Sequence, residues 1–420
     1  MKHLRINQIV KTISVTHKFD KPCLIAINTS DVDSGVMGEG TITDVKDLKG
    51  QFKKTIQKND ILFSEIRPAN RRFAKVEIED CRDYVVSTKL MVLRKFNDEV
   101  DLDYFYYSLT NQGFLNILQR RAENRIGSFP QITFDLLSEY SIPVPSLDEQ
   151  RKIARIISSL DRKITLNRAI NQNLEALAKQ LYEYWFVQFD FPNEEGKPYK
   201  SSGGKMVWNE DLKIYIPQDW GVCRLNDYIG KNNTGDWGAD EPSNNFIEVG
   251  CIRGADIIKL NDLPKRYIKS KNENKLLSEW DVVIEVSGGS PTQATGRSAY
   301  ITPGVIERNG GSITCSNFCH AFSLKNYVDS AYFFFVWQMF YDNNIMFNFE
   351  GKTSGIKNFM TEAFLANKWL KPPKPLVIKF FDVIKDIYAK IDSNIVENNN
   401  LVKQRDELLP LLMNGQVTID

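Results

Sequence analysis

Histidine is scarce in this chain of 420 residues, which contains only His3, His17 and His320. Acid–base catalysis most often uses histidine, so an active site built on that side chain has little support. No glycine-rich strand–turn–helix for S-adenosylmethionine occurs, and the loop 287–297 lacks the Gly-Lys-Ser/Thr ending of a phosphate-binding loop. Residues 371–374 are not the Asp/Asn-Pro-Pro-aromatic motif of an adenine methyltransferase. We therefore expect a non-catalytic chain with no cofactor of its own.

Long hydrophobic runs are also missing. The first 15 residues lack the apolar core of a signal peptide. The most apolar window, 331–341, is shorter than the roughly 20 residues that span a bilayer, so it predicts a buried aromatic helix. The six cysteines have irregular spacings, which predicts reduced thiols rather than a disulfide framework. We expect a cytoplasmic protein with no membrane role.

Two metal-like patterns are better interpreted as structural. Cys315, Cys319 and His320 resemble zinc ligands, but no second pair lies at zinc spacing and the stretch is predicted to be a strand. Asp190 and Glu195 resemble part of a magnesium-dependent nuclease motif, but they lie in a segment rich in proline and glycine that would not hold carboxylates rigidly. No metal site is predicted.

The composition is that of a folded protein, with 42% hydrophobic and 25% charged residues. A chain of this length is expected to form two or three domains. The formal net charge is only +1. Attraction to a polyanion depends on local patches rather than on this sum, so the charge has to be examined by segment.

An internal repeat is the strongest pattern in the sequence. The stretches 147–185 and 376–412 align position by position, with apolar residues alternately four and three apart, which is typical of helices that pair in a coiled coil. Both stripes carry two asparagines in the same layers, which predicts a fixed register, and the simplest mate of each helix is the other. The first stripe is Ile153, Ile157, Leu160, Ile164, Asn167, Asn171, Leu174, Ala178, Leu181 and Trp185; the second is Phe380, Ile384, Ile387, Ile391, Asn394, Asn398, Leu401, Arg405, Leu408 and Leu412.

The regions before the two helices correspond more loosely. Residues 60–64 resemble 281–285, 87–93 parallel 316–322, and 101–109 parallel 329–337, which predicts the order strand, loop, strand, helix in both halves. Prolines precede each long helix, at 143 and 145 and at 372, 373 and 375. The expected fold class is α+β: two similar globular domains separated by two long helices.

Three polar stretches are candidates for contact with DNA. The first is a basic stretch between strands, the second a pair of corresponding small-residue and cationic stretches, and the third a glycine-rich loop. Each also has a simpler interpretation, as a solvated surface, a turn before a helix or a flexible hairpin. The candidates are Lys53, Lys54, Arg67, Asn70, Arg71, Arg72 and Lys75; Arg120, Arg121, Arg125 and Ser128 with Lys352, Thr353, Ser354, Lys357 and Asn358; and Ser287, Ser290, Thr292, Gln293, Thr295 and Arg297.

Three segments carry a resemblance to a known family. Pro143-Val144-Pro145-Ser146-Leu147-Asp148-Glu149-Gln150 runs into a helix that ends Tyr182-Glu183-Tyr184-Trp185-Phe186; Ile216-Pro217-Gln218-Asp219-Trp220 opens the second half; and 411–417 close the chain. In this order they resemble the specificity subunits of type I restriction-modification systems, over essentially the whole chain. Two departures stand out: the second copy has Leu376-Val377-Ile378 in place of the Glu-Gln element, and the first half lacks the Trp-bearing opening.

The resemblance implies two target-recognition domains, each reading one half of a bipartite site in double-stranded DNA, and two helices paired antiparallel as a spacer. It also implies partners: methyltransferase subunits that use S-adenosylmethionine to methylate adenine, and a motor-endonuclease subunit that uses ATP and Mg. The expected boundaries are 1–145 and 213–375 for the domains, 146–190 and 376–420 for the helices, and 191–212 for a linker. A helix of about 36 residues is roughly 50 Å long, comparable to about fifteen base pairs.

Two other functions remain open from the sequence. A coiled-coil scaffold that binds proteins without reading DNA would show the same stripes. A stand-alone DNA-modifying enzyme is disfavoured by the missing motifs. Turnover by the purified chain would indicate the enzyme, whereas a complex with no preferred DNA sequence would indicate the scaffold.

Overall fold

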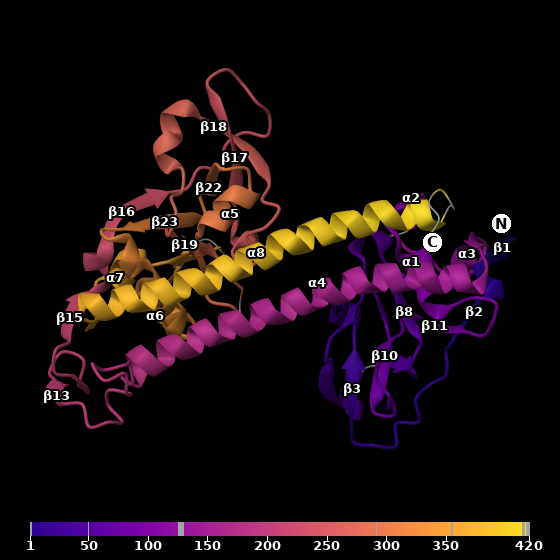
Figure 1. Ribbon diagram of the computed structural model, residues 1–420, viewed down its shortest axis with the longest axis horizontal. Coiled ribbons are helices and arrows are strands. Elements are labelled where there is room, and N and C mark those ends of the chain that lie inside the picture. Colours follow the sequence, from indigo (N-terminus) through magenta and orange to yellow (C-terminus); the bar gives the residue numbers. More distant parts are fainter. Residues whose placement is uncertain are drawn as a thin grey trace. The chain divides into compact units, whose positions relative to one another are not determined.

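The computed structural model describes residues 2–48, 50–124, 130–290, 292–353, 356–413 and 416, with the backbone alone at 352, 353 and 356. The chain divides into two compact units, Met1–Thr165 with Asn398–Asp420 (unit 1) and Leu166–Glu397 (unit 2). Each unit therefore contains part of both long helices, α4 (Leu147–Tyr182) and α8 (Lys374–Met413), which are the two long ribbons with these labels in Figure 1. In the part of the chain that is described, no helix is long and apolar enough to cross a membrane.

Unit 1 is built on two four-stranded sheets, ordered β6-β3-β10-β7 and β2-β11-β8-β9. The central strand β8 is buried at every position; Ile61 and Phe63 face the helices, whereas Leu62 packs against the other sheet. The elements are β1 (Lys2–Arg5), β2 (Val10–Thr12), β3 (Cys23–Ile27), β4 (Val32–Asp33), β5 (Val36–Met37), β6 (Thr41–Asp44), β7 (Phe52–Lys54), β8 (Ile61–Ser64), β9 (Phe73–Lys75), β10 (Tyr84–Ser87), β11 (Leu90–Lys95), α1 (Leu102–Thr110), α2 (Gln112–Glu123), α3 (Phe134–Ser138) and β12 (Ser141–Val144).

Unit 2 repeats most of this topology, without a counterpart of β7 among its described strands. Its sheet β16-β23-β19-β21 matches β2-β11-β8-β9, and β18-β17-β22 matches β6-β3-β10, including the parallel pair. The elements are β13 (Met206–Asn209), β14 (Ile214–Pro217), β15 (Gly221–Arg224), β16 (Ile229–Thr234), β17 (Phe246–Ile252), β18 (Lys265–Lys269), β19 (Val282–Glu285), β20 (Ser287–Gly288), β21 (Ser298–Tyr300), α5 (Pro303–Arg308), β22 (Ile313–Cys315), β23 (Cys319–Leu324), α6 (Ser330–Asp342), β24 (Glu350–Thr353), β25 (Ile356–Phe359), α7 (Thr361–Leu365) and β26 (Lys368–Lys371).

The turn before the central strand shows how closely the two units agree. Asn59 and Trp280 both have φ of 70°, in the left-handed region that non-glycine residues rarely adopt. The carboxylate that follows each of them accepts a backbone N–H three residues earlier, from Gln57 to Asp60 at 2.8 Å and from Ser278 to Asp281 at 2.9 Å. The predicted duplication of an α+β domain is therefore confirmed.

The aromatic window 331–341 lies in α6, as predicted. Tyr332, Phe333 and Trp337 are each at most 1% exposed, and the helix packs within the largest apolar cluster of unit 2. The segment predicted to be a linker is folded: the rings of Phe191 and Tyr199 stack at 4.7 Å, Phe191 also stacks on Trp220, and β13 pairs with β14.

The two long helices pack against each other antiparallel in both units. They are α4 (Leu147–Tyr182), which continues as a π-helical turn over Glu183–Val187, and α8 (Lys374–Met413). In unit 1, Arg405 of α8 donates to Asp161 of α4 at 2.8 Å. In unit 2, Asn394 donates to Asn171 at 2.7 Å and Asn167 donates to Glu397 at 2.7 Å. Every position of the two stripes is buried or half-buried, and the antiparallel pairing expected for this fold is confirmed.

Candidate nucleic-acid interface

One loop leaves the central strand of each unit at an equivalent place. The loop 65–71 lies between β8 and β9, and the longer loop 286–296 lies between β19 and β21. The backbone N–H of Ser64 donates to Arg72 O at 2.8 Å, and that of Glu285 donates to Arg297 O at 2.8 Å. Arg72 and Arg297 therefore occupy matching positions, where each loop returns to the sheet.

The fold also brings each loop beside a second predicted stretch. In unit 1 the N–H of Ile132 donates to Glu65 O at 2.8 Å, next to Gln131. In unit 2 the N–H of Phe359 donates to Val286 O at 2.8 Å, and β20 pairs with β25 of the 350–359 hairpin. Patches that are far apart in the sequence thus form one candidate surface in each unit, which we call recognition surface 1 and recognition surface 2.

The loop of recognition surface 1 is held in an unusual backbone conformation. Arg67 (φ 47°) and Arg71 (φ 55°) flank the 3₁₀ turn Pro68–Asn70, and both are left-handed without being glycine. Such strained residues persist where their surroundings fix them, and they concentrate at functional sites. The backbone N–H of Ala69 donates to Gln119 of α2 at 3.1 Å, which seats the turn beside the last turn of that helix.

Four predicted DNA contacts of unit 1 have partners within the protein. Arg71 donates to Gln112 at 2.6 Å and lies over the ring of Phe73, and Arg72 donates to Val32 O at 3.2 Å. Lys75 pairs with Asp103 at 2.5 Å. Lys54 donates to two backbone oxygens, at 3.0 Å and 2.8 Å, and burial lowers its pKa. The side chains that face solvent are Lys53, Arg67, Asn70, Arg120 and Arg121.

Recognition surface 2 has an exposed tip on an anchored base. At the tip, the N–H of Ser290 donates to Gln293 O at 3.0 Å; Ser290 is half-buried, whereas Thr292 and Gln293 are exposed. At the base, Ser287 donates to Asn358 at 2.6 Å, and the N–H of Thr295 donates to Glu350 at 2.7 Å.

Arg297 and Lys357, both predicted from the sequence to contact DNA, are paired within the protein at this base. Arg297 makes two parallel hydrogen bonds to Glu285, at 2.8 Å and 2.7 Å, and this contact raises the pKa of the guanidinium. Lys357 pairs with Glu350 at 2.8 Å.

Five predicted residues cannot be placed in these surfaces by their side chains. Arg125, Ser128 and Ser354 lie outside the described residues. Lys352 and Thr353 have a described backbone, in β24, where they pair with Lys357 and Ile356. Their assignment to DNA binding stays a prediction.

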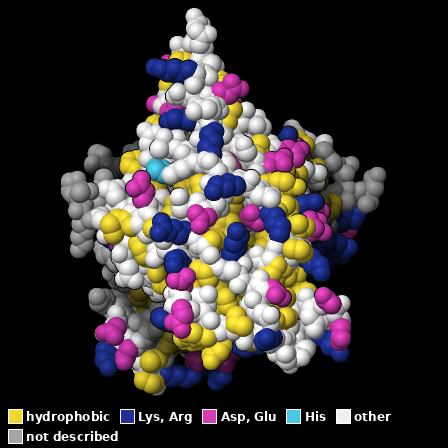
Figure 2. Space-filling model, turned by 90° about the vertical axis from the view of Figure 1, so that its left-hand side faces the viewer, with side chains coloured by type: hydrophobic (Ala, Val, Ile, Leu, Met, Phe, Trp, Pro, Cys, Tyr) yellow, Lys and Arg dark blue, Asp and Glu magenta, His cyan; other side chains and the backbone are white. Residues whose placement is uncertain are grey.

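The surface charge is locally mixed. On the face shown in Figure 2, Lys and Arg side chains lie among Asp and Glu side chains, with hydrophobic areas between them. The phosphates of a DNA duplex bind best to a cluster of positive charges. The mixed charge of this face therefore does not favour DNA binding. In unit 1, the candidates for phosphate contacts are the exposed cations near the loop of recognition surface 1, such as Arg67, Arg120 and Arg121.

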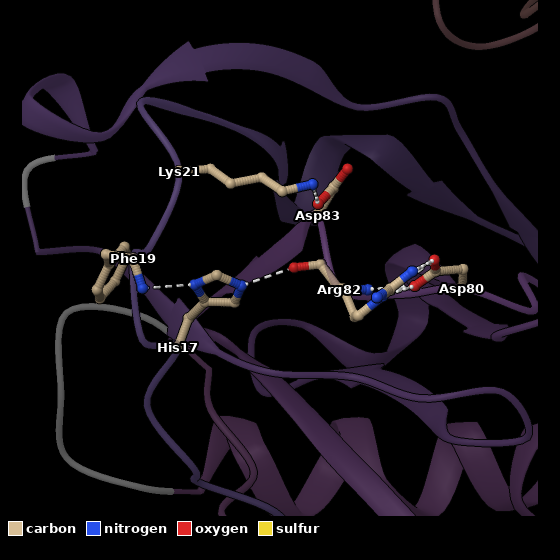
Figure 3. Close-up of polar contacts among 6 residues, drawn as sticks. All are labelled: His17, Phe19, Lys21, Asp80, Arg82 and Asp83. Carbon is tan, nitrogen blue, oxygen red and sulfur yellow. Dashed lines mark hydrogen bonds and ion pairs between the residues drawn. The ribbon is translucent and has the colours of Figure 1, made fainter.

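His17 belongs to a separate polar cluster of unit 1, drawn in Figure 3. Its Nε2 contacts Arg82 O at 2.8 Å, and its Nδ1 accepts the backbone N–H of Phe19 at 2.9 Å. Both ring nitrogens therefore form hydrogen bonds with backbone groups, and the ring connects two loops. The neighbouring cations are paired as well, Lys21 with Asp83 and Arg82 with Asp80, although they border a cavity of about 650 Å³. The arrangement is a structural clip.

Metal binding has no candidate cluster in the described part of the chain, where no group of three or more His, Cys, Asp or Glu side chains is placed around one point. Cys315 and Cys319 are buried on β22 and β23, and burial raises the pKa of both thiols, that of Cys319 to about 12. These cysteines behave as small apolar side chains of a sheet core.

The sequence did not reveal the carboxylates of unit 2. Glu285 is 3% exposed and ends the otherwise apolar strand β19, and Glu350 lies 65 residues further along. A charged residue that closes an apolar strand is a usable signal, because a buried charge requires a partner. The sequence does not show which basic residue pairs with Glu285, because many lysines and arginines follow it.

Comparison with known proteins agrees with this architecture. Residues 24–176 match the family model described as the type I restriction modification DNA specificity domain. The type I restriction enzyme HindI specificity subunit of Haemophilus influenzae is 28% identical, and the match covers 99% of both chains. The MjaIX specificity subunit of Methanocaldococcus jannaschii is 27% identical over 77% of this chain and 71% of its own.

A solved structure shares the fold. The crystal structure of the type I restriction-modification system S subunit from M. genitalium aligns with a TM-score of 0.51 at 15% identity, over 98% of this chain and 95% of that one. The family model and the named relatives define a non-catalytic, DNA-recognition class of protein. The domain match and the relatives aligned over the whole chain support a specificity subunit of the type I restriction-modification class, as the resemblance in the sequence indicated.

Proposed function

We propose that this subunit reads a bipartite site in double-stranded DNA, with recognition surface 1 on one half-site and recognition surface 2 on the other. The observation that supports the proposal is the duplicated loop: 65–71 and 286–296 leave equivalent strands with the same backbone bonds, yet differ in length and side chains. A shared scaffold with different loops suits a protein that reads two different sequences.

The loops offer the chemistry for this task. Arginines give two-point contacts to phosphate or to guanine, and the amides of Asn70 and Gln293 match the donor and acceptor edge of adenine. Exposed Arg120 and Arg121 would position the duplex by its phosphates. We further propose that α4 and α8, each of which contributes to both units, act as the spacer that sets the unread gap.

The catalytic steps belong to partners in this proposal. Methyltransferase subunits would bring S-adenosylmethionine and methylate adenine, and a motor-endonuclease subunit would bring ATP and Mg. The subunit described here would supply the sequence preference of the complex, in the cytoplasm where its DNA lies. No step of that chemistry is assigned to its own residues.

A domain exchange tests the proposal. Residues 1–145 are replaced by the corresponding domain of another family member, and modified adenines are mapped in DNA from cells that express the chimera with its partner subunits. One half-site should change while the other half-site and the gap stay the same. The reciprocal exchange of 213–375 is the matched control and should change the opposite half-site. A change in both half-sites, or in neither, contradicts the proposal; the absence of any preferred sequence in the unexchanged complex favours a protein-binding scaffold.

A further inference from the structure

We propose that two carboxylates, the buried Glu285 and the half-buried Glu350, are positioning residues for recognition surface 2. They hold the base of the loop 286–296 so that its exposed tip meets DNA in a single conformation. The inference rests on the proposed reading of a half-site by unit 2. It also assigns Arg297 and Thr295 to the clamp rather than to DNA.

Glu285 is built into its place from several sides. Its side chain is 4% exposed, and both carboxylate oxygens accept from Arg297, whose side chain is 16% exposed. A Cβ added to Gly254 would lie 2.5 Å from Glu285 Oε1, and one added to Gly288 would lie 2.6 Å from the same atom. Gly288 also has φ of +145°. The carboxylate therefore fills a recess that only glycine leaves open.

Glu350 holds the same loop from the neighbouring hairpin. Its Oε1 accepts from the backbone N–H of Thr295 at 2.7 Å and from the Thr295 hydroxyl at 3.3 Å, and its Oε2 pairs with Lys357. Burial alone would raise the pKa of Glu350, but the hydrogen bonds from Lys357 and Thr295 lower it overall. The ionised carboxylate is the form that these contacts favour.

Four consecutive residues after the tip are each anchored by a side chain. Tyr341 donates to Ala294 O at 3.3 Å, Glu350 binds Thr295, Trp337 donates to Gly296 O at 2.7 Å, and Glu285 binds Arg297. Within the tip, by contrast, the backbone bonds join Ser290 and Gln293 to each other. An exposed loop that is fixed before binding loses less conformational entropy when it contacts DNA. The anchored base is thus a device for selectivity rather than a contact surface.

Unit 1 shows that this clamp is particular to the second loop. Ser64 stands in the position of Glu285, and the guanidinium of Arg72, which matches Arg297, donates to Val32 O instead. The shorter loop 65–71 is seated on α2 through Ala69. Removal of the carboxylates should therefore affect one half-site only.

The test uses the assembled complex with its partner subunits and a selection from randomised DNA. Glu285→Gln and Glu350→Gln keep the side-chain volume but remove the charge that binds the loop. Discrimination against a single wrong base pair in the half-site of unit 2, normally about tenfold or more, should fall towards onefold, while the half-site of unit 1 is read as before. Glu279→Gln, an exposed glutamate of the same unit, is the matched control and should leave both half-sites unchanged.

A double variant keeps the test valid if Glu285→Gln fails to fold because Arg297 is left unpaired. Glu285→Gln with Arg297→Gln leaves no unpaired charge at this place. It should lose selectivity at the unit 2 half-site without a change in the slope of log affinity against log salt concentration. A slope shallower by about one would show that Arg297 binds a phosphate, and would overturn the clamp.

The two proposals fail differently. Unit 2 variants that read both half-sites as sharply as the unsubstituted complex contradict the clamp and leave the proposed function intact. An unsubstituted complex with no half-site for unit 2 contradicts the proposed function itself. Intact reading of the unit 1 half-site in each variant shows that the complex is assembled.

Discussion

Asn394 of α8 donates its side-chain amide to Oδ1 of Asn171 on α4 at 2.7 Å, and Asn171 donates in turn to Ile391 O at 3.3 Å. Asn394 is 1% exposed, so water cannot replace a lost partner. A polar pair inside an apolar seam favours the one register in which both amides are satisfied, at some cost in stability. The matched asparagines of the two stripes therefore fix how α4 and α8 pair in unit 2.

Replacement of one of these asparagines should destabilise unit 2. Asn394→Leu leaves the amide of Asn171 without this partner, and the free energy of unfolding should fall by about 1–3 kcal/mol. Adding Asn171→Leu should recover most of the loss, because both polar groups are then gone. All seven tryptophans lie between 185 and 369, so tryptophan fluorescence during urea denaturation reports on unit 2. Lys390→Leu, on the exposed face of α8, is the control; a single variant as stable as the unsubstituted protein would contradict the role of the pair.

Asp281 should be a source of pH-dependent instability. Burial raises its pKa, although the N–H of Ser278 and the hydroxyl of Ser323 lower it in part. For a raised pKa, the stabilising contribution is complete below the ordinary value near 3.8 and is lost as pH rises through the folded-state pKa. The unsubstituted protein should therefore lose stability as pH rises from about 3.8 to the folded-state pKa, whereas Asp281→Asn should not. Above that pKa, the difference in the free energy of unfolding between the two proteins should stay constant. Urea denaturation by tryptophan fluorescence, from a pH below the ordinary value of 3.8 up to neutral pH, measures this difference. A difference that does not change with pH would refute the expectation.

Asp60, the equivalent residue of unit 1, should stabilise its unit through an ion pair. Its buried carboxylate makes two hydrogen bonds with Arg94, both at 2.8 Å, whereas Ser323 stands in the place of Arg94 in unit 2. Asp60→Asn leaves the guanidinium uncompensated and should cost about 3 kcal/mol. Hydrogen exchange of β8 and β11 measures the loss in unit 1, since the tryptophans do not report on it. Exchange as slow as in the unsubstituted protein would show that the ion pair contributes little.

A comparison of Arg121 with Arg82 should distinguish an arginine that contacts DNA from an arginine that is only a surface charge. Both are exposed arginines of unit 1, but Arg121 lies beside recognition surface 1 on α2, whereas Arg82 is paired with Asp80 on another loop. Arg121→Ala should make the slope of log affinity against log salt concentration shallower by about one, because one phosphate contact is lost. Arg82→Ala should leave the slope as it is. The measurement is the DNA affinity of the assembled complex at a series of salt concentrations. Equal slopes for the two variants would show that Arg121 does not contact DNA.

Cysteine reactivity should follow burial. Cys23 is exposed, whereas burial raises the pKa of Cys251 and of Cys319 to about 12. Only the thiolate reacts readily, so iodoacetamide should modify Cys23 first and reach Cys251, Cys315 and Cys319 only on unfolding. Mass spectrometry of native and denatured samples measures this. Rapid native labelling of Cys315 or Cys319 would mean that the sheet around β22 and β23 opens.

The candidate site could be predicted only in part. The loops were found because runs such as Arg67 to Arg72 combine cations with proline and an amide, a local pattern. Which of these side chains face solvent could not be read from the sequence, because Arg71, Arg72 and Lys75 find their partners 28 to 41 residues away. The same holds for Arg297 and Lys357, because only the fold brings them against Glu285 and Glu350.

The sequence by itself determined the elements that depend on local periodicity. The two stripes with their asparagines specify long paired helices, and the repeated order of strands and helix specifies a duplicated α+β domain, since these patterns follow from the geometry of 3.6-residue and two-residue periods. Only the tertiary structure decided which candidate side chains are available to DNA. Ion pairs and hydrogen bonds join residues by distance in space, and packing, not spacing along the chain, placed Glu285 against Arg297 and left Gln293 exposed.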